Sequence, residues 1–358
     1  MKSLFKKSTD SISVAAVPMR YQYSFAVMFV YFTISSAFAG SAIGTIITDP
    51  TGQYNYMPAG INDNAQVVGW YGGSFVASFE YSNGIYTTIN NPNGQTSASG
   101  INNNGQIVGT FYTNEFNNAY GFVYSNGVYT TLSGPSDNYN GGFTIANGIN
   151  NLGDVVGNYL NSELQRYGFI YSNGVYTTIN DPNASVDSHN GLITEATGIN
   201  DSGQIVGTYS DVNGASHGFE YNNGVYTTID HPSTVFSYSY GTQLTGINNN
   251  GQIVGFFTGS DGREYGFEYT NGVFKTLSYP NPFDEQAGPG DGTFIQGINN
   301  NGQLIGYYAT HNNIVSFITS ADSIISSGPP VPVPAAIWLF ASALSGLLCI
   351  TRRSKKAN

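Results

Sequence analysis

The residues of this sequence that could do chemistry include six copies of a loop rich in Asn, Asp and Gly. The loop reads GINDSGQIVG at 198–207, and near copies begin at residues 60, 100, 148, 246 and 297. Asn and Asp oxygens beside Gly are typical of calcium loops, but these copies lack the evenly spaced carboxylates and the final Glu that calcium requires. A phosphate loop needs a following helix and Lys, and neither follows the motif. We therefore expect no metal and no cofactor here.

The histidines and acidic residues do not form a recognisable catalytic pattern. The histidines fall in different copies of the repeat at non-equivalent positions, which predicts surface loops for all four: His189, His217, His231 and His311. No nucleophile elbow and no His-x-x-x-His pair is present. Two acidic pairs could serve glycoside hydrolysis, but we prefer to interpret them as solvated loop charges, which need no further explanation: Asp261 with Glu264, and Asp284 with Glu285. We predict a non-enzymatic protein, with a secreted carbohydrate-active enzyme as the alternative.

Aromatic residues placed in loops are the better candidates for a binding role. Long segments of variable sequence separate the repeats, and five aromatic residues lie in them: Tyr139, Phe236, Tyr238, Tyr240 and Phe283. Aromatic rings can stack on sugar rings while nearby Asn and Asp bind hydroxyl groups. Variable loops on a rigid scaffold are where binding usually occurs. These residues could therefore contact an extracellular polysaccharide, or they could only pack their loops.

Short strands joined by tight turns are the elements that must position these residues. Charged residues make up 9% of the chain, which has 45 Gly, 27 Tyr and 22 Phe, a composition typical of β structure. One repeat contains four extended runs, at 192–200, 204–209, 217–221 and 225–232. Asp201-Ser202-Gly203 and Asn222-Asn223-Gly224 separate them at two hairpin positions. Each repeat is thus predicted to be a four-stranded antiparallel meander.

Repeats that recur every 40 to 51 residues predict a ring of sheets. The fourth-run motif, (Y/F)xT(I/L)xxP, occurs five times, beginning at residues 86, 129, 176, 226 and 274, and the last repeat ends before its own copy. GTIITDP at 44–50 matches the missing motif, so the first strand of the exported chain should complete the last sheet. The sequence therefore predicts an all-β, six-bladed β-propeller over residues 40–325, closed by its N-terminal strand. A linear β-solenoid is the alternative, but it has no use for a displaced strand.

The repeat resembles a known bacterial family. GIN(D/N)xGQIVG followed by HGF or YGF and NGVYTTI is similar to the HAF-type extracellular repeat of bacterial surface proteins. The eponymous His-Ala-Phe is His217-Gly218-Phe219 in one copy and Tyr-Gly-Phe in others. The resemblance implies export and repetition but no defined activity.

The N-terminus is predicted to be a signal peptide. Basic residues up to Arg20 precede an apolar run that ends in Ala37-Phe38-Ala39, which indicates a secretory signal at 1–39 with cleavage before Gly40. Met19 is an alternative start, and an uncleaved anchor is the alternative fate. Signal peptidase is the partner that this segment implies.

The C-terminal segment 326–358 is predicted to be a sorting signal. It combines a proline-rich motif, Val331-Pro332-Val333-Pro334-Ala335, with 17 uncharged residues at 335–351 that could form a transmembrane helix. A basic tail follows, formed by Arg352, Arg353, Lys355 and Lys356. The order resembles the PEP-CTERM signal, in its Val-Pro-x-Pro-Ala variant, that exosortases recognise in Gram-negative bacteria. The Glu of the parent Pro-Glu-Pro motif is missing, and a bare tail anchor is the alternative.

Charge excludes one class of partner. Between the two signals the chain has three Lys and Arg against 21 Asp and Glu, a formal charge of −18. Nucleic-acid binding requires a positive surface, so it is excluded. We therefore predict an exported, surface-sorted repeat protein of the cell envelope or extracellular matrix. It would be held at the inner membrane, briefly or lastingly, by its C-terminal helix.

Overall fold

The computed structural model describes residues 44–47, 56–72, 76–113, 118–135, 143–185, 193–237, 240–279, 288–311 and 313–324. All regular elements in these ranges are β-strands. The predicted signal peptide with its cleavage site (1–40) and the predicted sorting signal (326–358) lie outside the described residues. Within the described ranges there is no helix that is long and apolar enough to cross a membrane.

Four separate antiparallel sheets each contain four consecutive strands. The first consists of β2 (Tyr56–Ile61), β3 (Val67–Gly72), β4 (Val76–Ser82) and β5 (Ile85–Ile89). The second consists of β6 (Gln95–Ile101), β7 (Ile107–Thr113), β8 (Asn118–Ser125) and β9 (Val128–Leu132). The third consists of β10 (Thr144–Ile149), β11 (Val155–Leu160), β12 (Arg166–Ser172) and β13 (Val175–Ile179). The fourth consists of β14 (Thr194–Ile199), β15 (Ile205–Ser210), β16 (Ser216–Asn222) and β17 (Val225–Thr228). This last sheet matches the four runs predicted for the repeat at 192–232.

The remaining eight strands form one sheet, so the structure has four separate four-stranded sheets where the sequence predicts six. One half holds β18 (Thr242–Ile247), β19 (Ile253–Thr258), β20 (Glu264–Thr270) and β21 (Val273–Leu277). The other holds β22 (Gly292–Ile298), β23 (Gln303–Thr310), β24 (Asn313–Ser320) and β1 (Thr45–Ile47). A single parallel pair, Glu264 with Gly292, joins the halves. Backbone groups at this junction are close enough to pair, which merges two meanders into one sheet.

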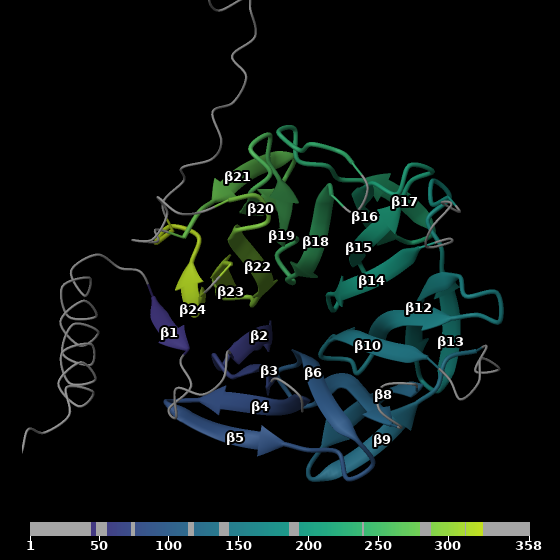
Figure 1. Cartoon of the computed structure of the whole chain (residues 1–358). Helices are drawn as coiled ribbons and strands as arrows, with labels where there is room; N and C mark the ends of the chain where they lie inside the picture. The colour runs from purple at the N-terminus through teal and green to yellow at the C-terminus, as the bar shows by residue number, and fades with distance from the viewer. Residues whose placement is uncertain are drawn as a thin grey trace, which may run out of the picture. The chain divides into compact units, whose positions relative to one another are not determined.

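The sheets stand around a common centre, so the chain is a β-propeller (Figure 1). The first strand of each meander, such as β14, lies innermost and the fourth lies outermost (Figure 1). Each junction between neighbouring sheets is filled by a fully buried Phe from the third strand, for example Phe219 on β16. Gly207 faces this ring on β15, and a Cβ there would lie 2.7 Å from Phe219 and 2.0 Å from the Glu195 carbonyl oxygen. Glycine is therefore required because both ring and backbone occupy the space of a side chain.

The prediction that the N-terminal strand closes the last meander is confirmed. β1 pairs antiparallel with β24, with Thr45 opposite Ile318 and Ile47 opposite Ser316. Ile47 is buried in a cluster that also contains Ile61, Val67 and Phe79 of the first sheet. Segments that are far apart in sequence therefore share one hydrophobic core (Figure 1).

A closed ring of hydrogen bonds runs through the six copies of the GIN motif. The side-chain amide of each motif Asn donates to the backbone oxygen of the next motif Asn, at 2.9–3.2 Å. The ring passes in order through Asn62, Asn102, Asn150, Asn200, Asn248 and Asn299 and returns to Asn62. All six side chains are buried. The motif therefore ties each meander to the next.

A second ring uses the residue that follows each motif Asn. Its backbone N–H donates to the side-chain Oδ1 of its counterpart in the next meander, at 2.7–2.8 Å. The ring contains Asp63, Asn103, Asn151, Asp201, Asn249 and Asn300. The two carboxylates occupy opposite positions, and each accepts amide hydrogens from both neighbours; for Asp201 these are Asn151 and Asn249. Burial acts to raise the pKa of Asp201, but these hydrogen bonds outweigh it and hold the pKa below its usual value.

The two kinds of turn differ, although the sequence predicts the same tight hairpin for both. Asn223 and Gly224 have positive φ angles of 49° and 88°, as the predicted type I′ turn requires. The β14–β15 connection instead spans five residues, because the last strand pair is Ile199 with Ile205. Its shape comes from Asn200, whose Oδ1 accepts the backbone N–H groups of Ser202 and Gln204, both at 3.1 Å.

The pairing of β1 with β24 predicts that two adjacent residues of β1 contribute very differently to the free energy of unfolding. Ile47 is 3% exposed and Ile46 is 45% exposed. Ile47→Ala should lower the free energy of unfolding by about 2–4 kcal/mol, because it leaves a cavity in the shared core. Ile46→Ala should change it by less than about 0.5 kcal/mol. Urea unfolding measures both, and equal effects would contradict the closure.

The asparagine ring predicts a large cost for losing one buried amide. Asn200→Ala removes three bonds within the turn and one to Asn248. The free energy of unfolding should fall by roughly 2–4 kcal/mol, since partner groups are left buried and unpaired. Ser202→Ala, in the same turn but exposed, serves as the control and should be nearly neutral. A neutral Asn200→Ala would mean that the ring does not stabilise the fold.

Candidate functional site

The side of the ring where the GIN motifs lie, here called the turn side, has a hollow. The polar groups that line this hollow are already hydrogen-bonded to one another. The hollow has a volume of about 70 Å³ and is lined by the Ile-Asn-(Asn/Asp) segments of all six repeats. The Asn and Asp side chains around it are occupied by the two hydrogen-bonded rings. No group of three or more His, Cys, Asp or Glu side chains suited to a metal ion occurs within the described ranges.

On the opposite side of the ring, His217 stands where other meanders carry Tyr. The equivalent residue is Tyr120 on β8, Tyr167 on β12 and Tyr265 on β20, and each stacks on an aromatic ring of the preceding strand at 5.4–5.9 Å. His217 stacks on Tyr209 in the same way, with centroids 5.1 Å apart. Its other face is covered by Phe236 from the β17–β18 connection, at 4.7 Å and 16°. The imidazole is thus held between two parallel rings.

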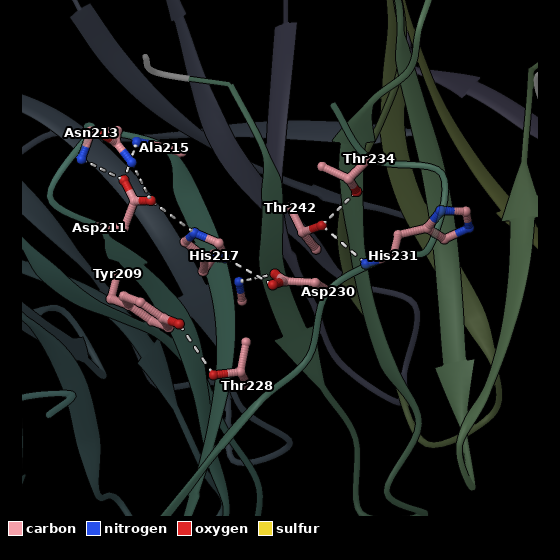
Figure 2. Close-up of polar contacts among 11 residues, drawn as sticks. Tyr209, Asp211, Asn213, Ala215, His217, Thr228, Asp230, His231, Thr234 and Thr242 are labelled. Atoms are coloured by element: carbon pink, nitrogen blue, oxygen red, sulfur yellow. Dashed lines mark hydrogen bonds and ion pairs between the residues drawn. The ribbon is translucent and has the colours of Figure 1, made fainter. Parts of the chain in front are cut away.

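Two carboxylates face the two ring nitrogens of His217 (Figure 2). Asp230 Oδ2 lies 2.8 Å from Nδ1, and Asp211 Oδ2 lies 3.6 Å from Nε2. The hydrogen bond with Asp230 raises the pKa of His217, and the charges of both aspartates add to this effect while burial opposes it. The charged form of this imidazole is therefore favoured more strongly than that of an ordinary histidine.

The chain positions both carboxylates through its loops. Asp211 opens the β15–β16 connection, and its Oδ1 accepts the backbone N–H groups of Asn213 and Ala215, both at 2.9 Å (Figure 2). Its Oδ2 faces His217 and also accepts the side-chain amide of Asn213 at 3.4 Å. Asp230 follows β17, and its Oδ1 accepts the N–H of Gly218 at 3.2 Å. A third carboxyl group, that of buried Asp181, interacts electrostatically with His217, and burial raises its pKa.

Two of the five aromatic residues predicted for binding lie beside this cluster. Phe236 and Tyr240 are 43% and 45% exposed in the β17–β18 connection. Tyr139, Tyr238 and Phe283 lie outside the described residues. The sequence analysis missed His217, Asp211 and Asp230 as a group, although the replacement of Tyr by His in one Tyr-Gly-Phe copy was a usable signal.

The prediction of surface positions for the histidines is wrong for His231. This side chain is buried and stacks on Phe257 at 3.7 Å and 9°. Burial lowers the pKa of His231 to about 4, so the ring is neutral at neutral pH. His217 is half-buried, whereas His311 is exposed and contacts Asp291. His189 lies outside the described residues.

Of the two acidic pairs, the structure describes Asp261 and Glu264, and these two carboxyl groups have different surroundings. Asp261 accepts a hydrogen bond from the Tyr265 hydroxyl at 2.7 Å. Glu264 is buried rather than solvated, accepts from Thr258, and has its pKa raised to about 7 by burial. Asp284 and Glu285 lie outside the described residues. The prediction of solvated loop charges is therefore wrong for Glu264.

Comparisons with known proteins add only distant structural similarities. No protein-family model matches the sequence, and no curated protein matches it either. The fucose-specific lectin of Aleuria aurantia is 12% identical with a TM-score of 0.47, over 78% of this chain and 98% of the lectin. AofleA of Arthrobotrys oligospora is 11% identical with a TM-score of 0.41, over 77% of this chain and 87% of its own. Virginiamycin B lyase of Staphylococcus aureus is 11% identical with a TM-score of 0.40, over 77% and 98% of the two chains. At such TM-scores the similarities carry no argument about ligand or activity.

The environment of His217 predicts a pH-dependent contribution to stability. Because the folded pKa is raised, the contribution is complete below the ordinary pKa of about 6.5 and is lost as the pH rises through the folded pKa. His217→Tyr, the residue of three sister meanders, retains stacking without titrating in this range. The stability of the wild type relative to this variant should therefore decline as the pH rises above about 6.5. Urea unfolding from about pH 5.5 upwards measures this difference, with Asp181, Asp211 and Asp230 present in both proteins, and a difference that stays constant would contradict the assignment.

Proposed function

We propose that this chain is an exported, non-enzymatic β-propeller that binds a saccharide on the side carrying the β15–β16 and β17–β18 connections. The observation that carries the proposal is a pair of exposed aromatic residues near His217: Phe236 stacks on the imidazole, and the backbone oxygen of Tyr240 accepts the N–H of the adjacent Ser216 at 3.2 Å. The proposed ligand surface consists of these residues together with Asp211 and Asp230. We refer to it as the His217 surface.

The proposed architecture has six blades. The parallel pair between Glu264 and Gly292 that merges the eight-stranded sheet has counterparts between separate sheets: Ala119 with Phe143, Arg166 with Ile193, and Ser216 with Gly241. Each of these contacts is a single parallel bridge, and the merged sheet differs only in that Gly292 is the first residue of β22, whereas the other three partners each precede the first residue of their strand. The hydrogen-bonded rings also pass through six equivalent members, which supports counting the eight strands as two blades.

A saccharide fits the chemistry of the His217 surface better than a charged polymer does. Exposed aromatic rings stack on the apolar faces of sugars, and carboxylates accept hydrogen bonds from hydroxyl groups. The −18 charge of residues 40–325 repels anionic polymers. A neutral polysaccharide is therefore the proposed class of ligand.

The geometry favours binding over catalysis. A histidine that acts as a general base needs one ring nitrogen directed at the substrate and one directed at an orienting group. Both nitrogens of His217 face aspartates, so neither is directed at an incoming substrate. An imidazole held between two carboxylates orders its loops and offers no ring nitrogen to a substrate.

Binding should depend on the two exposed aromatic side chains. We expect Phe236→Ala combined with Tyr240→Ala to weaken polysaccharide binding by about tenfold or more, since stacking supplies part of the affinity. Glycan arrays probed with the purified full chain, in a detergent without sugar groups, measure it. Val225→Ala, an exposed apolar residue on outer strand β17, is the matched control. Binding that survives the double variant, or no binding to any glycan, would overturn the proposal.

Export and surface sorting complete the proposal and rest on the two terminal signals. The expected partners are signal peptidase at Ala39–Gly40 and an exosortase at Val331–Ala335. The expected location is the cell surface or the extracellular matrix. Mass spectrometry of the termini of the native protein distinguishes a processed chain from one that keeps its signal, its C-terminal helix or both.

A further inference from the structure

A second polar cluster lies at the junction between the third and fourth sheets. It consists of Asn158 on β11, Arg166 on β12 and Glu195 on β14. The Arg166 guanidinium donates through Nη1 to Oε1 of Glu195, and the Asn158 amide donates to the same oxygen at 3.2 Å. The three side chains therefore share one acceptor atom and must lie together. β14 is an innermost strand, so the cluster is close to the centre of the ring (Figure 1).

Two buried atoms of this cluster have no hydrogen-bond partner among the described residues: Oδ1 of Asn158 and Nε of Arg166. The first is an acceptor and the second is a donor, and Asn158 is only 2% exposed. Buried polar groups are nearly always paired, so two adjacent exceptions of opposite type indicate a missing group that both donates and accepts. A hydroxyl group has this property.

The third side chain gives the cluster an opening. The Glu195 side chain is 29% exposed, and its hydrogen bonds with Arg166 and Asn158 both use Oε1. Its Oε2 can therefore accept a hydrogen bond from a molecule that arrives from solvent. Arg166 and Glu195 also cancel each other's charge, so the cluster attracts neither an anion nor a cation strongly.

The fold does not need this polar set. At the equivalent junction between β19 and β22, Phe256 stands in place of Asn158 and Phe294 in place of Glu195. These rings pack against each other at 5.0 Å, while the residue equivalent to Arg166 is Glu264, whose buried Oε2 also has no hydrogen-bond partner among the described residues. The fold therefore does not require Asn158 and Glu195 at their two positions.

We propose that Asn158, Arg166 and Glu195 bind two neighbouring hydroxyl groups of a neutral sugar or polyol. One hydroxyl accepts from Arg166 Nε and donates to Asn158 Oδ1, while the other donates to Glu195 Oε2. The site shares no residue with the His217 surface, and its assignment does not depend on the proposed function.

The test uses the purified full chain in a detergent without sugar groups, with D-mannose, D-galactose, L-fucose and myo-inositol as probes. Ligand-detected NMR should show saturable binding of at least one probe. Glu195→Gln and Asn158→Thr should each weaken it by about tenfold, because each removes or weakens a hydrogen bond to a hydroxyl group. Thr is chosen because it occupies the equivalent positions 110 and 208, so the variant should fold.

Two controls separate this site from the rest of the protein. Gln243→Ala changes the residue of β18 that is equivalent to Glu195 and should leave binding unchanged. Phe236→Ala with Tyr240→Ala should also leave it unchanged, so failure of the His217 surface can be distinguished from failure of this site. The proposal is overturned if no probe saturates, if Glu195→Gln binds normally, or if a crystal structure grown with the probes shows only a water molecule between Asn158 and Arg166.

Discussion

The ring of asparagine amides is the interaction on which the rest of the structure depends. Each of the six amides reaches from one meander to the backbone of the next, and the last returns to the first. The same side chain shapes its own turn, as Asn200 does through Ser202 and Gln204. One buried residue per repeat thus sets both the local loop and the spacing of the sheets. A chain with one cysteine cannot rely on internal disulfides, so packing and such bonds must hold it.

Because the turn side is committed to these rings, variation is concentrated on the other side. There, Tyr gives way to His217 in one meander, and Asn158 and Glu195 meet at one junction where another junction has Phe256 and Phe294. Both departures bring a charged side chain into a position that is uncharged in the sister repeats just named. Repetition makes them visible, because each altered residue can be compared with its counterparts in the same chain. The repeat supplies the scaffold, and its exceptions supply the candidate chemistry.

Much of the architecture could be predicted from the sequence because it depends on local signals. Asn-Gly pairs fixed the type I′ turn at Asn223, and a displaced copy of one motif revealed the pairing of β1 with β24. The five-residue turn was missed because it depends on side-chain bonds from Asn200 rather than on backbone preference. The merging of two meanders and the burial of His231 were missed because both depend on contacts between neighbouring sheets. Phe236 and Tyr240 were anticipated from their loop, but their polar neighbours come from elsewhere in the fold.

The pairing of β1 with β24 also sets the order of events during biosynthesis. The first strand of the propeller cannot find its partner until the polypeptide has been made as far as residue 320. Until then, Ile47 and the core that it completes face solvent. Asn62 can bond to Asn102 but not yet to Asn299. Contacts this distant in sequence form slowly. An incomplete chain therefore cannot acquire the finished fold, and a translocation machine that handles unfolded polypeptide would meet no prematurely sealed ring.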